Sequence, residues 1–182
     1  MNGISGLKYF VTGRGENLIT SETLPEARKG TGKVYQILTE TMERYWNKQS
    51  LLYWTKLSAE LDARKTEAYK ANPLFPYEFF DAMADAVLRW HQQHFKGTAD
   101  IEIKPLFQRL WKYHRMYLGE PLTEELVEKF MADGDAIVAD QNVAAKEIIL
   151  RMVIAICNDL DRRNPTEEQK VEKTDEQAGE TT

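Results

Sequence analysis

The sequence has one cysteine, Cys157, among 182 residues, so no disulfide can form within the chain. Its first residues show no charged start followed by an apolar run, and no apolar stretch is long enough to cross a bilayer. These absences favour a cytoplasmic protein without membrane contact, because reducing compartments keep thiols free. We expect Cys157 to act as a small buried hydrophobe.

Several signatures of catalysis are also missing. The Gly13–Gly15 tip is not followed by Gly-Lys-Ser/Thr, so it does not match a nucleotide-binding loop, and no serine or cysteine lies in a recognisable hydrolase setting. His91 and His94 share a helix face and could join His114 on a metal ion. No carboxylate or cysteine at ligand spacing completes that set, so we expect core or capping histidines and no cofactor.

One carboxylate motif raises the question of whether the chain is an enzyme. Residues 124–128 (Glu-Glu-Leu-Val-Glu) resemble half of the magnesium site of all-helical nucleotide pyrophosphohydrolases, in which carboxylates on two facing helices hold the metal. The second half, Glu-x-x-Asp, is missing, since Glu147 is followed at that spacing by a leucine. Glu40 and Glu43 with Glu78 and Asp81 provide two halves that lie too far apart. A pyrophosphohydrolase therefore remains a minor alternative to a solvated helix face.

Helical periodicity dominates the chain. Apolar residues recur at three- and four-residue steps over residues 31–71, from Pro76 or Tyr77 to Phe95, from Pro105 to Leu118, after Thr123, and over Val143–Leu160. The last segment is apolar over more than one face, so we expect a core helix. Gly119 and Pro121 should end one helix, and Thr123 should cap the next. The pattern predicts an all-α bundle of five to six helices.

The two ends of the chain differ from this pattern. Residues 1–30 are expected to form an arm, in which Leu7–Thr12 and Asn17–Ile19 could pair as a small β-hairpin. Residues 31–163 should form the helical domain. Residues 164–182 contain six acids, two bases and no aromatic residue, so we predict a disordered acidic tail.

Charge is distributed unevenly along the helical domain. Residues 28–70 hold nine bases against five acids, and residues 89–115 hold six against two, whereas residues 120–140 hold one base against seven acids. Such zoning bears on partners rather than on the fold. It yields two candidate surfaces.

The basic candidate interleaves cations with aromatic rings over Arg89–Lys96 and Arg109–Arg115, a composition that nucleic-acid surfaces use for phosphate contact and stacking. Helical spacing places Trp111 and His114 on the core side and leaves Tyr113 free. The possible nucleic-acid-binding residues are Arg89, Lys96, Arg109, Lys112 and Arg115. The alternative is a core aromatic stripe with a solvated cationic back.

The acidic candidate surface comprises Glu120, Glu124, Glu125, Glu128, Asp133 and Asp135. Glu124 and Glu128 are like charges four residues apart, and only a pair between Glu125 and Lys129 offsets their repulsion. A surface of this kind could occupy a cationic groove that normally holds DNA. An acidic helix face is also commonly just solvated.

The run from Leu106 to Arg163 resembles small helical accessory proteins of phages and integrative elements in gut Firmicutes. Its segments are Leu-Phe-Gln-Arg-Leu-Trp-Lys-Tyr-His, Leu-Thr-Glu-Glu-Leu-Val-Glu-Lys-Phe and a last helix ending Asp-Leu-Asp-Arg-Arg. In size and layout the chain is similar to anti-CRISPR proteins that inhibit type II Cas9. The resemblance implies a non-enzymatic protein, in the bacterial cytoplasm, that binds Cas9 with its guide RNA and blocks target DNA, its PAM or cleavage. Cas9 reads the PAM with arginines and holds nucleic acid in cationic channels, which suits an acidic competitor. The alternative is a nucleic-acid-binding accessory protein of a mobile element.

Overall fold

The computed structural model describes residues 18–48, 51–96, 102–139 and 143–166. The named elements of this part of the chain are six helices, which confirms the predicted all-α fold. They are α1 (Leu24–Tyr45), α2 (Leu51–Ala71), α3 (Tyr77–Phe95), α4 (Ile103–Tyr117), α5 (Glu124–Ala139) and α6 (Val143–Arg163). None of these helices has an apolar run long enough to cross a membrane.

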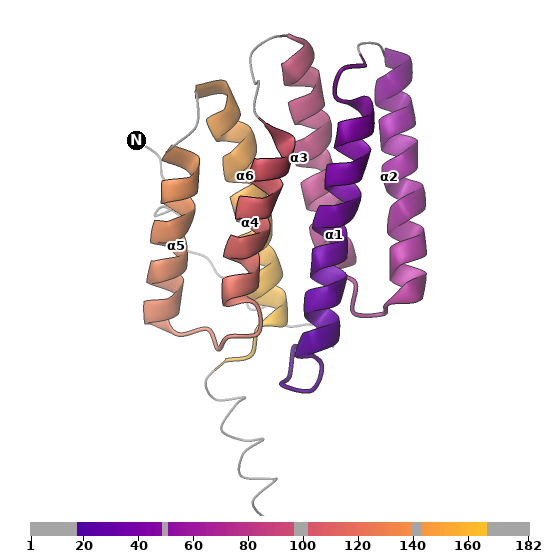
Figure 1. The fold of residues 1–182 in the computed structure, drawn as a ribbon. Coiled ribbons are helices and arrows are strands. Elements are labelled where there is room, and N and C mark those ends of the chain that lie inside the picture. Colours follow the sequence, from indigo (N-terminus) through magenta and orange to yellow (C-terminus); the bar gives the residue numbers. More distant parts are fainter. Residues whose placement is uncertain (1–17, 49–50, 97–101, 140–142, 167–182) are drawn as a thin grey trace, which may run out of the picture.

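The helices form a bundle with α2 and α5 at its opposite edges (Figure 1). Helix α3 packs along α6, and α1 packs along α4, so these four helices surround the centre. Helix α2 closes one side against α1 and α3, and α5 closes the other against α6 and α4. One face of α5 is therefore left for solvent.

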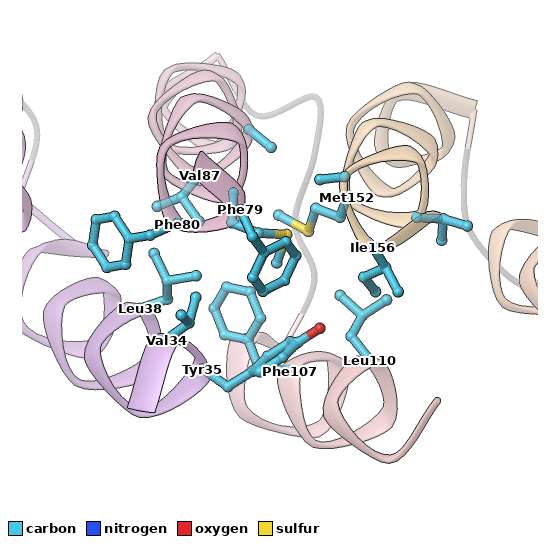
Figure 2. Close-up of a cluster of buried hydrophobic side chains, with 14 of the residues drawn as sticks. Val34, Tyr35, Leu38, Phe79, Phe80, Val87, Phe107, Leu110, Met152 and Ile156 are labelled. Atoms are coloured by element: carbon cyan, nitrogen blue, oxygen red, sulfur yellow. The ribbon is translucent and has the colours of Figure 1, made fainter. Parts of the chain in front are cut away.

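The core is built where these four central helices meet. Figure 2 shows side chains of α1, α3, α4 and α6 converging there, among them Tyr35, Phe79, Phe107 and Met152. The apolar stripe of α6 is buried as its spacing predicts, and Ile156 in its middle is fully excluded from solvent. Cys157 is also buried, and burial raises the pKa of its thiol to about 11, so it remains an inert thiol.

Helix α1 begins at Leu24, inside the segment that the sequence assigned to an N-terminal arm. Gly30 and Gly32 are poor helix formers, yet both lie within α1. Glycine suits these two positions because neighbouring elements approach the helix closely there. A β-carbon at Gly30 would lie 3.1 Å from the carbonyl oxygen of Leu74, and one at Gly32 would lie 3.3 Å from the Trp111 ring. Close packing, not a turn, explains the two glycines.

The predicted hairpin has its first strand in residues 7–12, outside the described residues. Residues 18 and 19, the described part of its second strand, are not in a strand. The predicted disordered tail also lies outside the described part of the chain, apart from its first three residues. Those three residues pack on the bundle: Asn164 and Pro165 are buried, and Leu122 forms an isolated bridge with Thr166.

Asn164 ties the end of α6 to the turn after α4. Its Oδ1 accepts a hydrogen bond from the Gly119 N–H at 2.8 Å, and its Nδ2 donates to the Tyr117 carbonyl at 2.8 Å. The Ile19 N–H donates to the Arg163 carbonyl at 2.7 Å, which fixes the chain entering α1 on the same end of the bundle. These bonds satisfy backbone groups that helix ends leave without partners.

Replacing Gly119 with alanine should destabilise the bundle by about 1–3 kcal/mol. Gly119 has a φ of +85°, which side chains disfavour, and its added β-carbon would lie 2.5 Å from a Leu24 methyl. Urea unfolding of the wild type and of Gly119→Ala measures the difference. A variant as stable as the wild type would show that this turn does not constrain the junction of α4, α5 and α6.

Candidate functional site

The acidic surface lies on the outer part of α5 and the loop before it. Glu120, Glu124, Glu125 and Glu128 are all exposed, and none makes an ion pair with any described residue. The expected pair between Glu125 and Lys129 is likewise not formed. The helix start is well anchored, because the Leu126 N–H donates to the Thr123 hydroxyl at 3.0 Å, as the predicted cap requires. Glu124 and Glu125 then occupy the first turn, where the helix dipole favours negative charge.

The two aspartates of the predicted surface differ from the glutamates. At about 100° per residue, Asp133 lies roughly 180° around α5 from Glu124, whereas Asp135 lies roughly 20° from it. Accordingly, Asp133 is half-buried and its carboxylate accepts a hydrogen bond from the Tyr117 hydroxyl at 2.6 Å. Asp135 is half-buried on the glutamate side. Four exposed glutamates therefore form the accessible acidic surface, and Asp133 anchors α5 to α4.

The basic residues lie on α3 and α4, and all five are exposed: Arg89, Lys96, Arg109, Lys112 and Arg115. Arg89 makes an ion pair with Asp85 at 2.9 Å along the same helix. Lys112 and Arg115 make no ion pair with any other residue that the structure describes. Their helix, α4, is the neighbour of α5.

The aromatic residues among these cations are mostly not available for stacking. The expectation that Tyr113 is free is wrong: its side chain is buried, its hydroxyl donates to the Phe130 carbonyl at 2.8 Å, and its ring stacks on Phe130. Trp90 is also buried, and His114 lies in the core as expected. Tyr113 fills the α4–α5 contact because α5 covers the face of α4 that the sequence alone left open.

The three histidines lie in separate environments, each with its own partner. His91 is buried, with Nε2 3.0 Å from the Tyr45 carbonyl at the end of α1, so it acts as a capping histidine. The ring of His94 stacks on Trp46 with centroids 3.8 Å apart. Within the described ranges, no three His, Cys, Asp or Glu residues are arranged to hold a metal ion.

Apart from Glu43, the other carboxylates considered as partners of residues 124–128 or as a second site for a pyrophosphohydrolase are engaged in ion pairs. Glu147 pairs with Arg151 at 3.1 Å and Asp81 with Lys65 at 2.7 Å. Glu40 pairs with Arg64, and Glu78 pairs with Arg162. The structure does not bring these groups together with Glu124 and Glu128 into a shared cation site among the residues that it describes.

A buried polar network, which the sequence did not reveal, crosses the centre of the bundle. The Arg163 guanidinium donates to Asp159 at 2.8 Å and to the Thr31 hydroxyl at 3.1 Å. Nε2 of His114 lies 3.1 Å from the same Asp159 carboxylate, and Nδ1 of His114 lies 3.1 Å from the Tyr35 hydroxyl. The network therefore joins α6, α4 and α1. The only part of this network that the sequence indicates is the four-residue spacing of Asp159 and Arg163, which places them on one face of a helix.

The charges of this network follow from burial and from the partners. Burial would raise the pKa of Asp159, yet the Arg163 charge and the His114 contact together lower it, so Asp159 is ionised. Burial lowers the pKa of His114 and raises that of Tyr35. A neutral His114 ring can accept the Tyr35 hydroxyl at Nδ1 while its Nε2–H faces Asp159. The result is one buried ion pair flanked by neutral groups.

Replacing Asp159 with asparagine should destabilise the fold by about 3–5 kcal/mol, because the Arg163 charge would remain buried without its counter-ion. A matched control is available on the same helix, where Glu147 and Arg151 form an exposed pair with the same four-residue spacing. Glu147→Gln should cost at most about 0.5 kcal/mol. Equal losses for the two variants, measured by urea unfolding, would contradict a special role for the buried pair.

The free energy of unfolding should fall as pH is lowered below about 6.5, the ordinary pKa of histidine. Burial lowers the folded-state pKa of both His114 and His91, so between that lowered value and 6.5 the unfolded chain binds more protons. The slope is at most about 1.4 kcal/mol per pH unit for each histidine. Unfolding curves at several pH values test this, and His114→Gln should reduce the slope. An unchanged slope in that variant would contradict a neutral, buried His114.

Comparison with known proteins adds no relative: no protein-family model, curated protein or solved structure matches the chain.

Proposed function

We propose that this chain is a non-enzymatic inhibitor that binds Cas9 loaded with guide RNA, an anti-CRISPR protein acting in the bacterial cytoplasm. The observation that carries the proposal is the set of four exposed glutamates on and before α5, which make no ion pair within the described residues. Carboxylates without internal partners keep their full charge available for a cationic partner. Cas9 is proposed as that partner on the similarity of the chain, in size and layout, to anti-CRISPR proteins.

The scaffold suits a binding role because the acidic helix is held firmly on its inner side. Phe130, Gly134 and Ile137 of α5 are buried, and the Tyr117 and Tyr113 hydroxyls bond to Asp133 and to the Phe130 carbonyl. Glu124, Glu125 and Glu128 are thus presented on a fixed helix, and Glu120 lies on the loop just before it. Less conformational freedom is lost on binding when charges are already positioned.

The proposed mechanism is competition for the cationic surfaces that Cas9 uses for DNA. Arginines that read the PAM and channels that hold nucleic acid attract negative charge at close range and from a distance. An acidic helix seated there would exclude target DNA or its PAM. Because exposed charges are screened, the inhibitor should bind more weakly at higher salt.

Reversing the four glutamates (Glu120→Lys, Glu124→Lys, Glu125→Lys and Glu128→Lys) should weaken binding to Cas9 with guide RNA by about 100-fold or more, because like charges would then face each other. Affinity is measured by interferometry, and inhibition by a DNA cleavage assay. The matched control reverses Glu22, Glu43, Glu67 and Glu102, which are also exposed glutamates that make no ion pair among the described residues.

The control should retain inhibition, although it carries the same change in net charge. Full inhibition by the variant with the four reversed glutamates on and before α5 would contradict the acidic-surface mechanism. Equal loss of inhibition in both variants would show that net charge, not the position of the charges, determines binding. No binding of the unaltered chain to Cas9 would overturn the proposed function itself.

A second candidate, a nucleic-acid-binding accessory protein, is favoured by the exposure of Lys112 and Arg115 on α4. Burial of Tyr113 and Trp90 leaves phosphate contact as the main mode of binding. This function requires DNA or RNA affinity that falls steeply with salt and that Lys112→Glu with Arg115→Glu abolishes. Absence of binding at low salt would exclude it.

A further inference from the structure

A groove of about 720 Å³ opens at the end of the bundle where α1 and α3 begin and α2 and α6 end, the lower end in Figure 1. It lies apart from α5, and no residue of the acidic or basic surfaces lines it. Its volume falls in the range of small-molecule sites, and most of its wall is apolar, with Phe75 and Phe79 among the lining residues.

Two tyrosines of the groove wall are unusually exposed. The side chains of Tyr69 and Tyr77 are 50% and 40% exposed, and their rings meet edge to face with centroids 5.4 Å apart. Lys65 holds Tyr77 in place, since its Nζ lies 4.3 Å from the ring centroid and 2.7 Å from the Asp81 carboxylate. Adjacent exposed rings held in a fixed orientation can receive a flat apolar group without reorganisation.

The charges of the groove are unbalanced toward positive. Lys70, Arg162 and Arg163 line it, and of these Arg162 pairs with Glu78 and Arg163 with Asp159, which leaves Lys70 without an ion pair among the described residues. Partial burial lowers the pKa of Arg162, and the neighbouring charge of Arg163 adds to this. A net positive, partly enclosed wall favours an anion.

Arg163 can donate further hydrogen bonds. Its side chain is only 10% exposed and lines the groove, and its bonds to Thr31 and Asp159 use two donors on Nη1 and one on Nη2. A guanidinium has five N–H donors, so Nε–H and one Nη2–H have no partner among the described residues. Two neighbouring N–H groups of an arginine match the two oxygens of a carboxylate.

We propose that this groove binds a small organic anion with a planar aromatic body, an aromatic carboxylate. Its carboxylate accepts hydrogen bonds from Arg163 and gains from the charge of Lys70. Its ring packs against Tyr69 and Tyr77. Because Arg163 also donates a hydrogen bond to Asp159, which contacts His114, binding of the anion in the groove should change the environment of His114.

The test titrates the full chain with indole-3-acetate and, separately, with the neutral indole-3-acetamide, by calorimetry and by NMR of arginine Nε–H and histidine ring signals. The acid should bind saturably with a Kd of about 1 mM or tighter and shift the Arg163 and His114 signals. The amide should bind at least about tenfold more weakly, because it has no charge for Arg163 to recognise.

Rim variants locate the site without disturbing the core. Tyr69→Ala should weaken binding of the acid about fivefold, which corresponds to the typical contribution of one aromatic contact to the binding free energy. Tyr53→Ala is the matched control, since Tyr53 lies on the same helix outside the groove and should leave affinity unchanged. Absence of saturation, equal affinity for acid and amide, or equal weakening by the two tyrosine variants would each overturn the proposal. Cas9 binding is not involved in any of these readouts.

Discussion

The buried ion pair of Asp159 and Arg163, both on α6, is the point from which polar contacts reach two other helices, α4 and α1. Arg163 and His114 both contact the Asp159 carboxylate, and through Thr31 and Tyr35 the connection extends to α1. An ionised group in a protein interior is costly unless its partners are well placed, so the core tolerates Asp159 only in an arrangement close to this one. We interpret the network as a contribution to the relative positions of α1, α4 and α6, in addition to the packing of their apolar faces.

That fixed centre matters for the surface. Helix α5 has few buried side chains of its own and depends on α4 and α6 for its position, through Tyr113, Tyr117 and Asp133. The glutamates on its outer side make no ion pair with any residue that the structure describes. The molecule thus separates the residues that determine its shape from the charges that it presents outward, which is the arrangement that a binding protein needs.

Much of the fold was predictable because it depends on local pattern. The stripe of α6, the cap at Thr123, the glycine end of α4 and the start of α3 near Tyr77 are all short-range signals, and the structure confirms them. The start of α1 was missed, because the apolar periodicity was recognised only from residue 31, and the contacts of Gly30 with Leu74 and of Gly32 with the Trp111 ring are not visible in the sequence.

The candidate site was predictable only in part, for a similar reason. Exposure of Glu124, Glu125 and Glu128 agrees with their spacing on α5, whereas the hydrogen bond that holds Asp133 inward depends on Tyr117, a residue of another helix. Tyr113 was expected to be free because its cover comes from α5, and sequence spacing does not show which helix lies over which face. The buried network likewise depends on contacts between residues that are far apart in sequence, such as Thr31 and Arg163.

Amide hydrogen exchange of the chain, alone and bound to Cas9 with guide RNA, tests the central claim most directly. The account predicts that residues 120–135 become protected in the complex while the basic face of α4, residues 109–115, does not. Unchanged exchange in residues 120–135 together with protection elsewhere would contradict it.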